Sequence, residues 1–150
     1  ENGTWRSIYL AGTTELRDGN FGSPSTTASA DLIGALTVPQ VFDSIAIRID
    51  GPKAWDLQLQ IPWVITDTGT THLTELRNGT LNHRTIATPV PGTTTFTLTR
   101  PVLIGLITGS IDLVEALGDG TVTVDGDPAI LASLVGVVAP VDPDFAVVTP

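Results

Sequence analysis

A chain of 150 residues, 41% apolar and 15% charged, is long enough for one domain with a sizeable core and too short for several. Its net charge of −9, from 16 acidic and 7 basic residues, excludes the basic surface stripe that nucleic-acid binding needs. There is no cysteine, which excludes disulfides and thiolate metal ligands, and no apolar run approaches the roughly 18 residues of a membrane span.

The first 35 residues are predicted to lie outside the main domain. Residues 4–17 show a helical pattern, with Thr4 as a cap and Asp18-Gly19 as a stop signal. Gly, Ser, Thr and Pro dominate the stretch that follows, a composition typical of a linker. A chain that begins without Met fits a fragment of a longer protein. We assign three regions: the end of a preceding helical region (1–18), a linker (19–35) and the main domain (36–150).

The main domain is predicted to open with a well-marked helix. Thr37 is its cap, and Pro39 falls in the first turn, where no amide donor is missed. An apolar face follows at helical spacing, formed by Val41, Phe42, Ile45 and Ile49. Short helical turns are predicted on either side of this helix, at 31–36 and 52–56.

A run of strands comes next. Residues 57–66 alternate apolar and polar side chains with period 2, except that Pro62 removes a ladder donor and predicts a bulge or an unpaired side. Residues 71–77 and 80–85 form a hairpin, because Asn78-Gly79 between them is a strong signal for a two-residue turn. Two further strands are predicted at 93–99 and 121–124.

The C-terminal part is predicted to be mostly helical. Residues 101–108 are apolar on nearly every side, so protein or ligand has to cover them. Ser110 is predicted to cap a second helix, with Asp112 and Glu115 near its positive end. A final helix, 128–138, follows Asp127. The pattern as a whole predicts an α+β domain, a mostly antiparallel five-stranded sheet covered on one face by helices.

The sequence offers little for catalysis. Its two histidines, His72 and His83, fall on adjacent predicted strands and are neighbours at best, because counting from the turn places His72 opposite Thr85. With Asp67 or Glu75 they hold no spacing typical of zinc ligands. There is no Gly-x-Ser-x-Gly elbow. We therefore predict no catalytic residue, no metal site and no cofactor here.

Several motifs in a fixed order resemble a known family. They are Leu36-Thr37-Val38-Pro39-Gln40, Ile65-Thr66-Asp67-Thr68-Gly69, Glu75-Leu76-Arg77-Asn78-Gly79-Thr80-Leu81, Thr97-Leu98-Thr99-Arg100 and Gly120-Thr121-Val122-Thr123-Val124-Asp125-Gly126-Asp127-Pro128. Together they resemble the sterol-carrier-like domain at the C-terminus of zinc-dependent alkyl sulfatases, enzymes of the metallo-β-lactamase superfamily. The segment 5–17 resembles the end of the helical region before that domain.

The resemblance implies a strand order of 3-2-1-4-5 and a parent chain that is an alkyl sulfatase, a sulfuric ester hydrolase. The family's zinc ligands lie in a His-rich motif of an upstream catalytic domain, and no position here matches them. The resemblance therefore implies a fragment that is not itself an enzyme, with zinc in the missing domain.

The leading hypothesis is that the domain binds the long alkyl chain of the sulfate ester. One alternative is a structural or dimerisation module of the same enzyme, which could form a homodimer. The other is a free-standing lipid carrier, and the helical segment 1–18 argues against it. An apolar tunnel, rather than a filled core, favours binding. Its predicted lining is Phe42, Ile45, Trp63, Leu103, Leu106, Ile107, Ile130, Leu134 and Val138. A soluble domain is expected, and its compartment stays open between bacterial cytoplasm, periplasm and secretion.

Overall fold

The computed structural model describes residues 2–20 and 30–140, which belong to two compact units. In the first unit, helix α1 (Gly3–Asp18) begins where the Asn2 side chain accepts the Thr4 amide at 3.0 Å, and it ends at Gly19 with φ +83°. The predicted helix is confirmed, but its cap is Asn2 and not Thr4. The predicted linker falls mostly on residues 21–29, outside the described residues.

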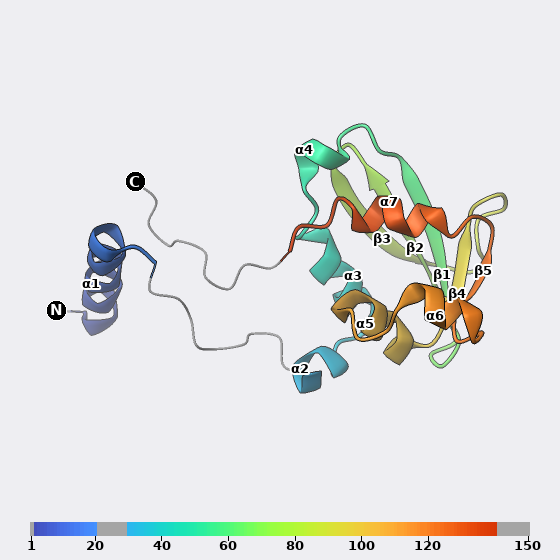
Figure 1. The fold of residues 1–150 in the computed structure, drawn as a ribbon, viewed down its shortest axis with the longest axis horizontal. Helices are drawn as coiled ribbons and strands as arrows, with labels where there is room; N and C mark the ends of the chain where they lie inside the picture. The colour runs from blue at the N-terminus through green and yellow to red at the C-terminus, as the bar shows by residue number, and fades with distance from the viewer. Residues whose placement is uncertain (1, 21–29, 141–150) are drawn as a thin grey trace. The chain divides into compact units, whose positions relative to one another are not determined.

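The second unit, Ala30–Pro140, contains a five-stranded sheet in the order β3-β2-β1-β4-β5 (Figure 1). Its strands are β1 (Leu59–Ile65), β2 (Thr70–Arg77), β3 (Thr80–Ile86), β4 (Thr95–Leu98) and β5 (Thr123–Asp125). Neighbouring strands are antiparallel except β1 and β4, which are parallel. The predicted fold class, strand number and strand order are confirmed.

Strand β1 lies at the centre of the sheet, and its alternation has the predicted effect. Ile61, Trp63 and Ile65 are at most 3% exposed and face the helices. Pro62 predicts a bulge or an unpaired side; it pairs with Leu73 in an unbroken register, so there is no bulge between β1 and β2. The register between β1 and β4 starts one residue later, at Trp63, which leaves the missing Pro62 donor outside that pairing.

The hairpin between β2 and β3 forms at the predicted turn. Asn78 and Gly79 both have positive φ, +52° and +70°, which is the conformation of a type I′ turn and matches the twist of the strands. The turn fixes the register, with Arg77 opposite Thr80 and His72 opposite Thr85, as the sequence predicts.

Six helices accompany the sheet in this unit: α2 (Ala30–Gly34), α3 (Val38–Ala46), α4 (Gly51–Ala54), α5 (Arg100–Thr108), α6 (Leu113–Gly118) and α7 (Ala129–Val135). Helix α3 begins in a capping box, in which the Thr37 amide donates to the Gln40 side chain at 2.9 Å.

Two predicted helix boundaries are wrong. Helix α6 is capped by Asp112, whose carboxylate accepts the amides of Val114 and Glu115, and not by Ser110. The Ser110 hydroxyl instead donates to the Gly105 carbonyl at the end of α5. Helix α7 ends at Val135, because the chain then turns to pair Val138 with Ile49 in an isolated bridge.

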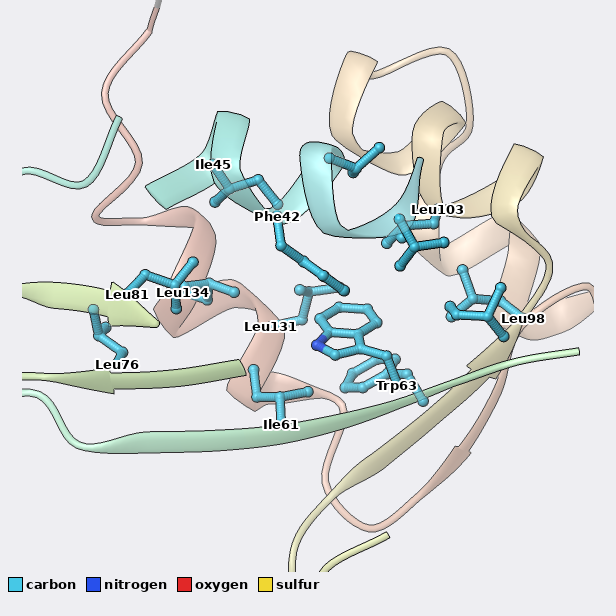
Figure 2. Packing of buried hydrophobic residues seen from close by; sticks show 14 of the residues in the cluster. Phe42, Ile45, Ile61, Trp63, Leu76, Leu81, Leu98, Leu103, Leu131 and Leu134 are labelled. Carbon is cyan, nitrogen blue, oxygen red and sulfur yellow. The ribbon is translucent and has the colours of Figure 1, made fainter. Parts of the chain in front are cut away.

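The core lies between one face of the sheet and the helices. Figure 2 shows Phe42 pointing from α3 toward Trp63 on β1 with Leu131 of α7 beside them, and Ile45 on the same side of the core as Leu134. The Phe42 and Trp63 rings are 5.7 Å apart, and Trp63 stacks on Phe96 at 5.1 Å. This aromatic row joins α3 to β1 and β4, and its Phe42 and Trp63 also line the site described next.

Candidate functional site

A cavity of about 510 Å³ lies between the sheet and the helices α3, α5 and α7. Its volume falls within the roughly 300–1,000 Å³ of small-molecule sites. Most of the lining is apolar. The lining residues are Phe42, Ile45, Arg48, Trp63, Thr74, Leu81, Leu103, Leu106, Ile107, Gly109, Ile111, Asp112, Leu113, Pro128, Leu131, Ala132, Leu134, Val135 and Val138. The space available therefore suits an apolar chain better than a polar metabolite.

The structure brings together eight of the nine residues that the sequence predicts to line an apolar site. They are Phe42, Ile45, Trp63, Leu103, Leu106, Ile107, Leu134 and Val138. Ile130 does not belong to this set. It lines a separate hollow with Gln60, Glu75 and Thr94, because it sits about 100° around α7 from Leu131, which faces the cavity. Ligand binding at the eight residues stays a prediction.

Other lining residues escaped the sequence prediction. Ile111 reaches the cavity across Gly105 of α5, where a Cβ would lie 2.5 Å from the Ile111 Cδ1 atom. A glycine inside an otherwise apolar helix indicates in the sequence that another side chain packs closely against the helix at that position. No sequence pattern marks Arg48 or Asp112 as lining residues, since only the folded chain places them on the same cavity.

The polar atoms in the cavity floor satisfy one another. The Trp63 indole Nε1 donates to the Thr74 hydroxyl at 3.0 Å, and that hydroxyl donates to the Ile61 carbonyl at 3.2 Å. Because both side chains have hydrogen-bond partners within the sheet, a ligand does not need to supply polar groups to satisfy them. With these polar atoms paired to each other, the floor favours hydrocarbon.

The two histidines lie beside Phe42 and away from any metal-binding geometry. Within residues 2–20 and 30–140, no group of three or more His, Asp or Glu side chains could hold a metal ion. The His83 Nε2 atom is 2.8 Å from the Asp43 carboxylate of α3. His72 is buried, its Nε2 atom contacts the Thr70 hydroxyl at 3.0 Å, and its Nδ1 atom has no partner. Both histidines thus help to dock α3 on the sheet.

We expect the stability of the domain to fall as the pH drops below about 6.5. Burial lowers the pKa of His72 below its ordinary value of 6.5, and the neighbouring His83 adds a smaller repulsion. In the unfolded chain His72 takes up a proton near pH 6.5, whereas the folded chain resists it. The stabilisation is therefore fully present above pH 6.5 and is lost as the pH falls toward the lower folded pKa.

Urea unfolding at pH 7.5 and 5.5 measures this effect. The variant H72Q, whose amide can keep the contact with Thr70, should show a smaller loss between the two pH values than the natural chain. The control H83Q should show most of the loss of stability that the natural chain shows between these two pH values. An equal pH dependence in the natural chain and H72Q would contradict the assignment to His72.

The helix-covered sheet, its strand order and its apolar cavity define a sterol-carrier-like α+β domain. The family model described as alkyl sulfatase C-terminal matches residues 26–150, and the chain belongs to this family. It is 33% identical over 150 residues to an (R)-specific secondary-alkylsulfatase of Pseudomonas sp., covering 100% of this chain and 22% of that protein. It is also 33% identical over 151 residues to a linear primary-alkylsulfatase of Pseudomonas sp., with the same coverage.

A solved structure agrees with these relatives. The stereoselective inverting sec-alkylsulfatase Pisa1 from Pseudomonas sp. superposes with a TM-score of 0.80 and 33% identity, over 97% of this chain and 23% of that chain. The chain spans about a fifth of the length of the curated relatives it matches, 22% in both cases. None of the helices in the described ranges is long and apolar enough to cross a membrane.

Proposed function

We propose that this domain holds the alkyl chain of a sulfate ester for a catalytic domain elsewhere in the same polypeptide. The observation that carries the proposal is the cavity of about 510 Å³ with its largely apolar lining. The names of the relatives, which are alkylsulfatases, supply the ligand class. The proposal assigns this part no catalytic residue, metal or cofactor, and it places the zinc and the chemistry in the region outside this chain.

Helix α5 carries apolar side chains on several faces, and some of them line the cavity. Leu103, Leu106 and Ile107 of this helix all line the cavity, and Leu103 is also buried in the core at 1% exposure. A helix that is apolar all round needs cover on more than the face that meets the sheet. A ligand tail lying against Leu106 supplies that cover.

The energetics allow useful affinity. Each buried methylene contributes roughly 0.8 kcal/mol, so a ten-carbon tail contributes about 8 kcal/mol before the costs of association. Those costs take up a large part of the gain and leave several kcal/mol net. Micromolar to millimolar binding of a single-chain amphiphile is the expected range.

Replacing Leu106 with Trp should abolish the binding of dodecanol while the domain stays folded. The larger side chain fills the space that the tail occupies, at an overpacking cost of about 1–3 kcal/mol. Native mass spectrometry at near-millimolar dodecanol measures the bound fraction. Val114 of α6 is 78% exposed and does not line the cavity, so V114W is a matched control that should bind like the natural chain.

The alternative is a structural or dimerisation module, which the exposed apolar side chains of α1 favour. Trp5, Ile8 and Tyr9 are each more than 60% exposed. The same mass spectra report the oligomeric state. A dimer that binds no dodecanol would support the structural role, and absence of both dimer and ligand would leave neither proposal standing. The proposal also covers the domain boundaries. Residues 1–18, with α1, form the end of a preceding helical region, and residues 19–35 form the linker to this domain.

A further inference from the structure

Arg48 occupies a fixed position on the wall of the cavity. It follows α3, is half-buried, and lies where residues 48–50 run beside residues 137–139. Its backbone carbonyl accepts the Ala139 amide at 2.7 Å, and its Nε atom donates to the Ala139 carbonyl at 3.0 Å. These bonds hold the stem of the side chain beside Val138, another lining residue.

Within residues 2–20 and 30–140, the charge of Arg48 has no acidic partner, because no ion pair there includes it. The hydrogen bond to Ala139 uses only one of the five guanidinium N–H donors. The other charged lining residue is Asp112, and its carboxylate already accepts the amides of Val114 at 2.8 Å and Glu115 at 3.1 Å. Counting the described residues, the cavity therefore carries one cation without an ion-pair partner and one anion already engaged in a helix cap.

We propose that Arg48 binds the anionic head of the amphiphile whose tail fills the cavity, either a sulfate ester or a carboxylate. This inference rests on the proposed function. A guanidinium offers parallel N–H groups that match the oxygens of such heads, and these bonds are stronger than those between neutral groups. The apolar walls strengthen the interaction further, because they lower the local dielectric constant.

The net negative charge of the chain disfavours binding of an anionic ligand, so a preference for such a ligand can be tested. With a net charge of −9, the protein as a whole repels a negatively charged ligand. A preference for an anionic amphiphile over a neutral one of equal length therefore requires a local cation. Arg48 is the cation that the lining supplies.

Three ligands with the same tail separate the contributions: decyl sulfate, decanol and decyltrimethylammonium. We expect the 150-residue chain to bind decyl sulfate about tenfold more tightly than decanol, as one charge-assisted hydrogen bond predicts. In R48Q this ratio should fall to about one. Arg77 is exposed on the hairpin and lines the second hollow rather than this cavity, so R77Q, which removes the same charge, should keep the tenfold ratio.

Salt provides a second measurement that needs no variant. Raising the salt from about 0.1 M to about 1 M shortens the Debye length from about 10 Å to about 3 Å, so the preference for decyl sulfate should shrink. An unchanged ratio in R48Q, or a preference for the cationic ligand, would overturn the role of Arg48 and leave tail binding intact. If decanol itself does not bind, the proposed function fails, and the inference fails with it.

Discussion

Replacing Phe42 with Ala is expected to lower the free energy of unfolding by about 3–5 kcal/mol, the usual range for a buried aromatic side chain. Phe42 is 0% exposed. Its ring lies 5.7 Å from that of Trp63, 5.9 Å from that of His72 and 5.7 Å from that of His83. Removing the ring therefore leaves a void at the contact between α3 and the first three strands, where little else can move in.

Urea unfolding at pH 7.5 measures the loss. Trp55 is a larger aromatic residue but is 64% exposed, so W55A should change stability by no more than about 0.5 kcal/mol. A loss below about 1 kcal/mol in F42A would contradict the packing described for this residue. Phe42 also lines the cavity, so saturating dodecanol should restore part of the lost stability, by mass action on the folded state.

Local signals in the sequence were sufficient for most elements of this fold. The alternation around Trp63, the turn at Asn78-Gly79 and the cap at Thr37 each depend on neighbours within a few residues, and the structure has all three. The strand order could not be read in this way. It came from the resemblance of the motifs to a family, because pairing between distant strands leaves no local pattern.

At two positions the sequence allowed two local structures, and the folded chain has one of them. Ser110 and Asp112 are both good capping residues, but the Ser110 hydroxyl is used at the end of α5, and Asp112 is left to cap α6. Pro62 predicts a bulge or an unpaired side of the strand, and the second outcome holds, because the pairing with β4 begins after it. In each case the partners present in the folded chain decided between two locally acceptable structures.

The cavity was predictable in composition and not in shape. A leucine that lines a space and one that fills the core have the same sequence signature, as Leu106, which lines the cavity, and Leu98, which is buried without lining it, show. Ile130 was misplaced because α7 begins only at Ala129, and the rotation of so short a helix depends on its packing. Arg48 was missed for another reason: its importance comes from residues 137–139, which lie about ninety positions away along the chain.

Replacing Gly79 with Ala is expected to lower the free energy of unfolding by at least about 2 kcal/mol. Part of this, about 1–2 kcal/mol, comes from the φ of +70°, which an L-residue adopts with difficulty. The rest comes from a close approach between two backbones. A Cβ on Gly79 would lie 2.7 Å from the carbonyl oxygen of Gly51, and a backbone atom at the start of α4 cannot move aside as a side chain would.

Gly69 provides the matched control, because it has nearly the same φ, +64°, and nothing within 4 Å of its Cβ position. G69A therefore carries the conformational cost alone, about 1–2 kcal/mol, and the difference between G69A and G79A measures the clash with Gly51. Urea unfolding of both variants beside the natural chain gives this difference. Equal losses in the two variants would mean that the tip of the hairpin does not press on α4, and that the contact between Gly79 and Gly51 contributes nothing to the fold.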